Sequence, residues 1–228
     1  MSLVSREVGQ SALSRFFSQA DQERIAEAVR EAERRTAGEI VPYVVGRSDG
    51  YEAAMWRGGL FFGLLALAVF VGVRRFTAVW LPLDAVTMAE TTCAAGCGGM
   101  LLVRLVPALK RLFAGDALMT RRVSQRAAEA FLSEEVFHTR DRTGILIFLS
   151  LFERKVLVVG DSGIHAKAPP GAWADVVQRI VSGIRSGRPA EGLIDAIRQS
   201  GALLETRGVA IRPDDADELP DTLRMGDP

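Results

Sequence analysis

The chain has 228 residues, enough for one ordinary domain together with a membrane element. Its 28 basic and 28 acidic residues cancel to a formal net charge of zero. This balance excludes a typical nucleic-acid-binding protein, which needs an excess of basic residues to neutralise phosphates. Hydrophobic residues make up 48% of the sequence, a high share for a chain with this many charges, and the excess lies in the middle of the chain.

The N-terminal part of the chain combines a polar start with one helix and one strand. Residues 1–18 hold no apolar segment of signal-peptide length, so we expect no cleaved export signal. Ser18 and Asp21 have the spacing of a capping box, which predicts that a helix begins here. Residues 40–45 predict a strand. Because Pro42 cannot donate a ladder hydrogen bond, we expect that strand to lie at a sheet edge or to carry a bulge.

The middle of the chain, residues 53–111, predicts a transmembrane hairpin. A spanning helix needs roughly 20 mostly apolar residues, and two arms, at about 55–73 and 84–106, come close to that length. A pair of arginines follows the first arm, and a lysine and an arginine follow the second. Sequence on both sides of the hairpin looks like one α/β domain, so its two parts must meet on the same side of the membrane and the two arms must span it as a pair.

Glu90 is an ionisable residue within the second arm. An acidic side chain inside a membrane span is costly, so it suggests a function such as an oligomeric channel or a proton path. The alternative is that the helix starts near Asp84, which leaves Glu90 only one to two turns deep in the membrane interface. The sequence leaves both interpretations open.

Small residues gather on the second arm. Cys93 and Cys97 share a helical face, which favours close helix packing, with metal binding or lipid attachment as alternatives. Ala95 and Gly99 belong to rows of small residues on the same arm. We expect these rows to pack against the first arm, and dimerisation through them is the alternative.

Basic residues also predict the orientation of the hairpin, because cationic residues near membrane ends favour the cytoplasm. The turn between the arms carries Arg74 and Arg75, whereas more basic residues flank the hairpin on its outer ends. The sequence therefore predicts a multi-pass protein of the bacterial inner membrane with its soluble segments in the cytoplasm.

After the hairpin the sequence predicts three helices and two strands. Residues 120–137 have helical spacing of apolar side chains, and so do residues 172–186 and 190–206. Residues 143–151 are a continuous apolar run, typical of a strand buried on both faces, which requires helices on both sides of the sheet. Residues 155–160 predict a second strand that forms a hairpin with the first.

We therefore expect an α/β fold that is interrupted by a membrane element. Its expected parts are a polar segment at 1–17, one α/β domain split between 18–52 and 112–207, a transmembrane hairpin at 53–111, and an acidic mobile tail at 208–228.

Several segments of this α/β domain resemble the TPM domain, in particular its multi-pass bacterial membrane branch. The resemblance covers roughly residues 18–206 and implies a TPM-like α/β/α sandwich interrupted by a two-helix transmembrane hairpin. Other members of the family are linked to photosystem repair, to auxiliary roles beside membrane receptors, to calcium binding and to phosphatase activity. The segments that carry the resemblance are Thr36-Ala-Gly-Glu-Ile-Val41, Arg142-Thr-Gly-Ile-Leu-Ile-Phe-Leu-Ser150, Glu153-Arg-Lys-Val156, Gly160-Asp-Ser-Gly-Ile164 and the helix with Trp173.

The chain departs from the soluble members of the family at two acidic positions. Their turn between the central strands carries adjacent aspartates, where this chain has Phe152 and Glu153. An Asn-Asp pair before their first helix is replaced by Phe16-Phe17-Ser18. Because calcium takes six to eight oxygen ligands, these changes weaken the calcium site that the resemblance would imply.

Glu153, Asp161 and His165 form the best candidate site, since they lie near the ends of the predicted strand hairpin. Two carboxylates and an imidazole could bind a divalent metal or act as acid and base. The alternative is that Glu153 is a turn residue, that Asp161 caps the Asp-Ser-Gly turn and that His165 is a surface residue.

Three functions follow from these patterns. The leading hypothesis is a membrane-anchored, cytoplasm-facing interaction module without turnover or cofactor, which assists the assembly or maintenance of a membrane complex. Its partners would be the lipid bilayer and a membrane protein or a second copy of the chain. The second is a hydrolase, phosphatase-like and dependent on a divalent metal at Glu153, Asp161 and His165. The third is an oligomeric channel that uses Glu90.

Overall fold

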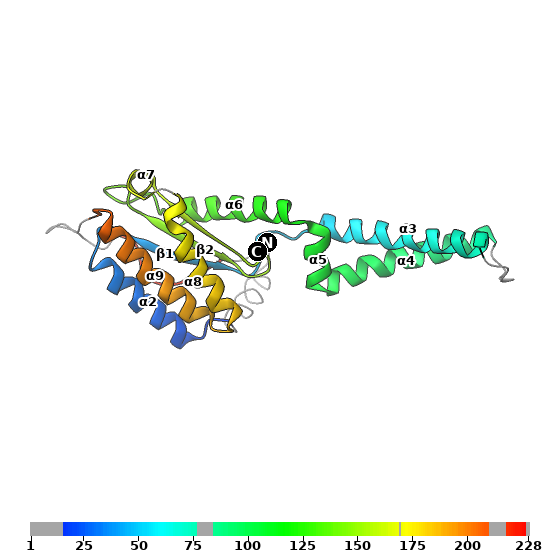
Figure 1. Ribbon diagram of the computed structural model, residues 1–228, viewed down its shortest axis with the longest axis horizontal. Coiled ribbons are helices and arrows are strands. Elements are labelled where there is room, and N and C mark those ends of the chain that lie inside the picture. Colours follow the sequence, from blue (N-terminus) through cyan, green and yellow to red (C-terminus); the bar gives the residue numbers. More distant parts are fainter. Residues whose placement is uncertain (1–15, 77–83, 169, 210–217, 227–228) are drawn as a thin grey trace. The chain divides into compact units, whose positions relative to one another are not determined.

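The protein is represented by a computed structural model (Figure 1), and its residues fall into two compact units. One unit comprises Met1–Ser48 with Arg121–Pro228, and the other comprises Asp49–Thr120. The structure describes residues 16–76, 84–168, 170–209 and 218–226.

The first unit is built around a four-stranded sheet of order β3-β2-β1-β4. Strand β1 (Ile40–Val45) pairs in parallel with β2 (Ile145–Ser150) on one side and with β4 (Arg224–Gly226) on the other. Strand β3 (Lys155–Gly160) pairs antiparallel with β2. The predicted hairpin of the two strands at residues 143–151 and 155–160 is thereby confirmed.

Strand β1 lies inside the sheet, so the prediction that Pro42 marks an edge strand is wrong. The Ile145 N–H donates to the carbonyl of Glu39 at 2.8 Å, which means that odd-numbered residues of β1 direct their backbone groups to β2. Pro42 therefore faces the β4 side, where pairing begins only opposite Tyr43. The sheet therefore loses no hydrogen bond because Pro42 lacks an N–H, and a proline can occupy this position.

The acidic C-terminal segment supplies β4, so the prediction of a wholly mobile tail is wrong for residues 218–226. Leu219 and Leu223 are buried, and they belong to the cores on opposite faces of the sheet. Arg224 is anchored by an ion pair from its Nε to Glu134 Oε2 at 3.1 Å. The burial of these two leucines thus holds this short acidic segment against the sheet.

Three helices cover one face of the sheet (Figure 1): α2 (Gln19–Glu33), α8 (Ala174–Arg185) and α9 (Pro189–Thr206). Helix α2 begins with the predicted capping box, in which the side chains of Ser18 and Asp21 each accept a hydrogen bond from the other residue's backbone N–H. The core beneath these helices includes Ile25, Val29, Ile147, Ile180 and Leu193, all fully buried.

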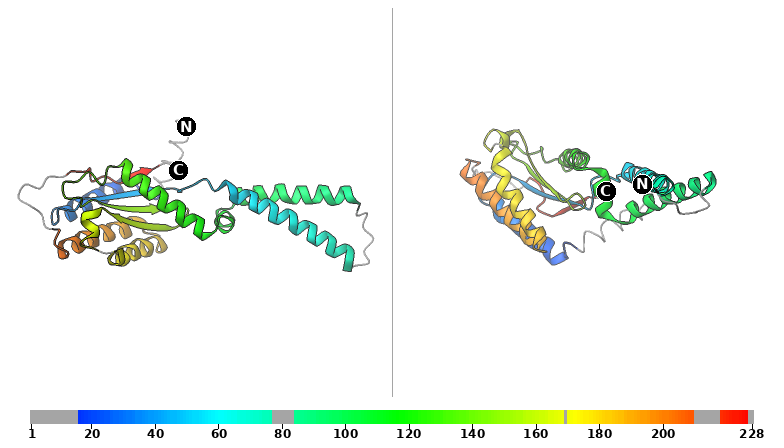
Figure 2. Two further views of the ribbon diagram at one scale, coloured as in Figure 1. Left: turned by 90° about the horizontal axis from the view of Figure 1, so that it is seen from above. Right: turned by 45° about the vertical axis from the view of Figure 1, so that its right-hand side comes forward.

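A single helix, α6 (Asp116–Ser133), covers the other face (Figure 2). Its Val123, Ala127 and Ala130 pack against side chains of β1 and β2, where the rings of Tyr43 and Phe148 stack with centroids 5.7 Å apart. All six residues of β2 are buried, as expected for a strand with helices on both sides. The predicted α/β/α sandwich is therefore confirmed.

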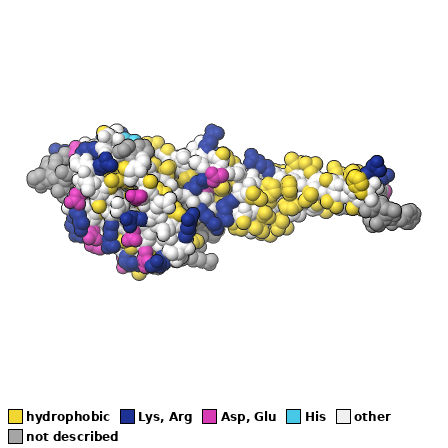
Figure 3. All heavy atoms as spheres, in the orientation of Figure 1, with side chains coloured by type: hydrophobic (Ala, Val, Ile, Leu, Met, Phe, Trp, Pro, Cys, Tyr) yellow, Lys and Arg dark blue, Asp and Glu magenta, His cyan; other side chains and the backbone are white. Residues whose placement is uncertain are grey.

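The second unit consists of α3 (Glu52–Phe76), α4 (Ala85–Leu105) and α5 (Pro107–Ala114). By length and composition, α3 and α4 could each cross a membrane. Only 17% and 11% of their most apolar windows is buried, and Figure 3 shows hydrophobic side chains gathered over this pair of helices. Helix α3 is therefore not the buried core helix of a soluble domain.

Small residues bring α3 and α4 together. A methyl group added at Gly59 would lie 2.4 Å from Cγ of Met100, and one added at Gly99 would lie 2.6 Å from Cδ2 of Phe62. Side chains at these positions would push the helices apart, because such contacts are shorter than van der Waals distance. The prediction that small residues of the second arm pack against the first arm is thereby confirmed for Gly99.

Candidate functional site

The structure does not bring the three predicted site residues together. Glu153 lies in the turn between β2 and β3, whereas Asp161 and His165 follow the other end of β3. A strand of this length separates its two ends by roughly 20 Å. Glu153 therefore cannot share a metal or a substrate atom with Asp161. Among the described residues, no group of three or more histidine, cysteine, aspartate and glutamate side chains could hold a metal ion.

Glu153 is a buried structural carboxylate. Its Oε1 accepts a hydrogen bond from the Ser48 N–H at 2.8 Å, and its Oε2 accepts a short hydrogen bond from the Ser150 hydroxyl. The hydroxyls of Ser48 and Ser150 are themselves 2.9 Å apart. Glu153 thus ties the end of β2 to the chain that leaves β1, which is more than the expected role of a turn residue.

Asp161 acts as a helix cap at the opposite end of β3. It precedes the short helix α7 (Ser162–His165), and its Oδ1 accepts from the Ser162 N–H at 2.6 Å. Its Oδ2 lies 2.9 Å from Nε of Arg142. His165 is exposed, and its Nδ1 lies 3.1 Å from the carbonyl oxygen of Asp161. The structure therefore agrees with the capping alternative for Asp161.

Glu90 lies in the second turn of α4. The helix begins directly after Asp84, whose Oδ1 accepts from the Thr87 N–H at 2.9 Å. At 1.5 Å per residue, Glu90 is about 9 Å along the helix from Asp84. Glu90 therefore lies near the N-terminal end of α4, where the helix begins late, after Asp84.

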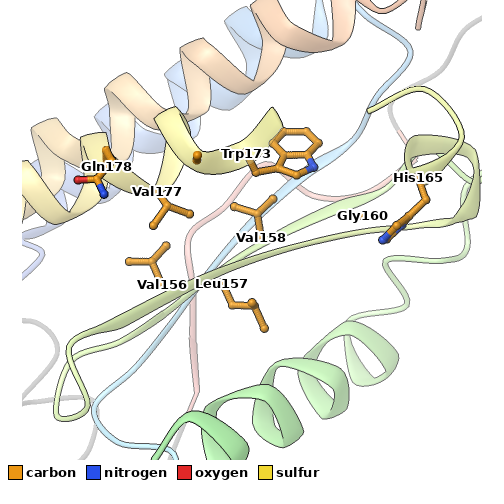
Figure 4. Close-up of a pocket in the computed structure, with 9 residues that line it drawn as sticks. Val156, Leu157, Val158, Gly160, His165, Trp173, Val177 and Gln178 are labelled. Atoms are coloured by element: carbon orange, nitrogen blue, oxygen red, sulfur yellow. The ribbon is translucent and has the colours of Figure 1, made fainter. Parts of the chain in front are cut away.

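A cavity of about 350 Å³ lies between β3 and the segment that leads into α8. The short 3-10 helix η1 (Pro170–Trp173) supplies Trp173, and α8 supplies Val177. Figure 4 shows these side chains turned toward Val156 and Val158 of β3, while Leu157 points to the opposite face of the sheet. His165 and Gln178 bring polar groups to the rim. The cavity is therefore open to one side and mainly apolar, with polar groups from His165 and Gln178.

A second unusual feature is a carboxyl cluster of Glu33, Glu39 and Asp221. The pKa of Glu33 is raised to about 9, mainly by burial and also by the neighbouring carboxylates of Glu39 and Asp221, whereas a hydrogen bond from the Ile40 N–H opposes the shift. That hydrogen bond measures 2.7 Å to Glu33 Oε1. Asp221 lies beside Arg30, with 3.6 Å between Oδ2 and Nη1. The cluster joins α2 to the chain before β4.

Sequence reasoning missed both of these features. It predicted a helix at residues 172–186, but nothing in the helical spacing shows that a cavity separates this segment from β3. It also assigned Asp221 to a mobile tail. A signal was present in Leu219 and Leu223, two apolar residues within an acidic segment.

The fold is an α/β/α sandwich domain with an inserted helical hairpin. Strand β1 of its sheet comes before α3 and α4 in the chain, and the other three strands of the sheet come after them. Residues 108–203 match the TPM_phosphatase family model, which describes the TPM domain. This match agrees with the resemblance of the sequence motifs to the TPM domain. The match begins after α4.

One solved structure shares this fold. It is the NMR structure of the BA42 protein from the psychrophilic bacterium Bizionia argentinensis sp. nov., with 19% sequence identity and a TM-score of 0.55. The alignment covers 92% of this chain and 96% of that chain. At this identity the likeness concerns the fold alone. No curated protein matches the chain.

Proposed function

We propose that the protein is a membrane-anchored TPM-domain interaction module, held by α3 and α4 in the bacterial inner membrane with its sheet domain in the cytoplasm. It would bind and assist a membrane complex without turnover. The observation that carries the proposal is the exposure of α3 and α4, because an apolar helix needs either a protein core or lipid around it.

Helix α3 fits neither a soluble core helix nor a signal sequence. A core helix of a soluble protein would be mostly buried, whereas α3 exposes Leu60, Leu64 and Val69 by 55–65%. A signal sequence would precede the folded domain, whereas α3 follows β1, a central strand of the sheet. Contact with lipid accounts for both the exposure of α3 and its place in the chain.

The sheet topology supports a hairpin that returns to its own side of the membrane. Strands β1 and β2 are adjacent and parallel, yet α3 and α4 lie between them in the chain. Both ends of the hairpin must therefore reach the same sheet, which requires an even number of spans. The flanking residues Arg57, Lys110 and Arg111 favour the cytoplasmic side under the positive-inside rule.

Binding is favoured over turnover by the chemistry of the cavity. Its walls are mainly valine and tryptophan side chains, whereas the buried carboxylates Glu153 and Asp161 are engaged in hydrogen bonds away from it.

The substitution Leu64→Arg tests the membrane anchor. Leu64 lies near the centre of α3 and is 55% exposed. An arginine at the centre of a membrane helix costs about 3 kcal/mol for insertion, so we expect much less of the chain to resist alkaline extraction of membranes. In a soluble protein the same exposed arginine would be tolerated.

Leu132→Arg is the matched control. Leu132 is 63% exposed and lies in α6, outside the hairpin. We expect this variant to stay in the membrane fraction like the wild-type chain. Equal extraction of wild type, Leu64→Arg and Leu132→Arg would contradict a membrane role for α3.

A further inference from the structure

Strand β3 presents unpaired backbone groups at the edge of the sheet. The Asp161 N–H donates to the carbonyl of Gly144 at 2.9 Å, so odd-numbered residues of this segment face β2. Val156, Val158 and Gly160 therefore direct their N–H and C=O groups outward. Among the described residues, no other strand pairs with β3 on this side.

The edge also lacks the features that protect exposed strands from pairing. Natural edge strands are blunted by prolines, bulges or several charged side chains. Strand β3 has the sequence Lys-Val-Leu-Val-Val-Gly, with one charge and no proline, and its pairing with β2 is continuous from Lys155 to Gly160. An apolar edge of this kind is suited to receive another strand.

The cavity lies beside the same edge and on the α8 face of the sheet. Val156 and Val158, whose backbone groups face outward, also line the cavity together with Trp173 (Figure 4). A strand added to β3 would place its alternate side chains on this face. One of those side chains would then enter the cavity.

We propose that β3 and its cavity bind an extended segment of a partner protein by strand addition, with a large apolar side chain of that segment in the cavity. Main-chain hydrogen bonds would supply affinity and the cavity would supply selectivity. The inference rests on the proposed function as an interaction module, for which it supplies the docking surface and the form of the partner.

A second copy of the chain fits this surface less well. In an antiparallel pair the residues directly opposite each other share a face of the sheet. A second β3 would therefore present Val156, Val158 and Gly160 to the cavity. Two valines and a glycine are too small to fill about 350 Å³, whereas a phenylalanine or leucine with its neighbours would occupy much more of it.

The test uses the full chain in detergent and a fluorescent peptide, Lys-Thr-Leu-Thr-Phe-Thr-Leu-Thr-Lys. We expect this peptide to bind the wild-type chain. A peptide of the same sequence with N-methyl groups on the residues that pair with β3 should bind at least tenfold more weakly. No binding of the unmodified peptide, or equal binding of both, would overturn the inference.

Val158→Pro removes one outward N–H and leaves the ladder with β2 intact, since that N–H makes no bond within the sheet. We expect tenfold weaker peptide binding. The matched control Val158→Thr keeps the N–H and nearly the same shape, and should bind as the wild type does. Thermal unfolding verifies that both variants are folded. Equal affinities of folded Val158→Pro and Val158→Thr would contradict strand addition.

Gln178→Trp tests the cavity from the exposed side of α8. The new ring can occupy the cavity, so we expect weaker binding of the phenylalanine peptide and little change for a peptide with alanine at that position. Arg179→Trp, one residue further and outside the cavity lining, is the control. If both variants bind the phenylalanine peptide equally, the cavity does not receive its side chain.

The outcomes also separate this inference from the proposed function. A chain that resists alkaline extraction but does not bind the peptide retains the membrane role and loses the strand-addition site. If the wild-type chain forms a dimer and Val158→Pro makes it monomeric, a second copy of the chain occupies the edge of β3. That result would overturn the inference of a partner segment.

Discussion

The carboxyl group of Glu33 has a different pKa in the folded chain and in the unfolded chain. Its pKa rises from 4.5 to about 9, mainly because the carboxyl is buried. Between these two values the folded chain holds a proton that the unfolded chain has lost. The free energy of unfolding therefore decreases as pH rises through this range, by up to about 1.4 kcal/mol per pH unit.

The substitution Glu33→Gln should remove this dependence. A glutamine stays neutral and can still accept the Ile40 N–H, so we expect a gain of up to about 5 kcal/mol in the free energy of unfolding at pH 8. At pH 4 the variant and the wild type should be equal, because the glutamate is then largely protonated in both states. Urea unfolding at both pH values measures the difference.

Glu23→Gln is the control on the same helix, at an exposed position. It should leave the pH dependence of stability unchanged. If Glu33→Gln gives the same gain at pH 4 as at pH 8, the effect does not arise from the charge of Glu33.

Glu153 leads to a second prediction at the residue scale. Glu153→Ala leaves the Ser48 N–H and the Ser150 hydroxyl without their carboxylate acceptor, and we expect a loss of about 1–3 kcal/mol in the free energy of unfolding. The loss should be the same with and without magnesium, since Asp161 lies at the other end of β3 and cannot share a metal ion with Glu153.

The exposed Glu129 in α6 provides the comparison. Glu129→Ala should change stability by less than about 0.5 kcal/mol. A destabilisation of Glu153→Ala that appears only in the presence of magnesium would instead indicate a metal ligand.

Contacts close in sequence were predictable at this scale, and distant ones were not. The capping box of Ser18 and Asp21 and the cap at Asp161 depend on residues only a few positions apart. The partner of Glu153, Ser48, lies beyond the whole hairpin insertion. No local pattern indicates that pairing, so the sequence led to the grouping of Glu153 with Asp161 and His165.

At the scale of elements, periodicity predicted most helices and strands. The place of β1 in the sheet and the existence of β4 depend on strand pairing, which periodicity does not show. The continuous apolar run of β2 predicted a strand covered on both faces, and this is confirmed. The position of β1 depended on its second partner, β4, which has only three residues. A segment so short has no recognisable period, which explains why both the edge prediction for Pro42 and the tail prediction failed.

Packing between α3 and α4 can be tested with two neighbouring glycines. Gly99→Leu would collide with Phe62, and we expect it to destabilise the hairpin by about 1–3 kcal/mol. Gly98→Leu should have little effect, because no atom lies within 4 Å of the added Cβ. The melting temperature of the full chain in mild detergent measures both.

If both glycine variants melt at the same temperature, the helix contact at Gly99 does not hold the pair together. The comparison is direct because the two sites are adjacent and introduce the same side chain. Self-association of both variants at the wild-type level would also show that neither glycine is needed for dimerisation.

At the scale of the whole molecule, the predicted organisation rested on the sharp change of composition at the hairpin. Residues 53–111 were predicted as the insertion, and the second compact unit is Asp49–Thr120. The family match at 108–203 starts only after α4. The cavity beside β3 was not predictable, since it depends on how α8 and β3 are spaced in three dimensions.

The proposed orientation predicts where a reporter is accessible. A tag joined after Pro228 and a tag inserted at Gly187, in the turn before α9, should both be reached by protease only after the inner membrane is opened. Both positions belong to the first unit, so they must give the same answer. Accessibility of both tags in intact spheroplasts would contradict the cytoplasmic orientation.

The central place of β1 has a consequence for biosynthesis. This strand leaves the ribosome before the hairpin, but both strands that flank it come later, and β4 follows α9. During translation its backbone edges stay unpaired until β2 and β4 have been made, and in the proposed membrane-anchored protein the hairpin would enter the bilayer within this interval. We therefore expect the newborn domain to need protection from aggregation during this interval, and a slowed insertion step to lengthen it.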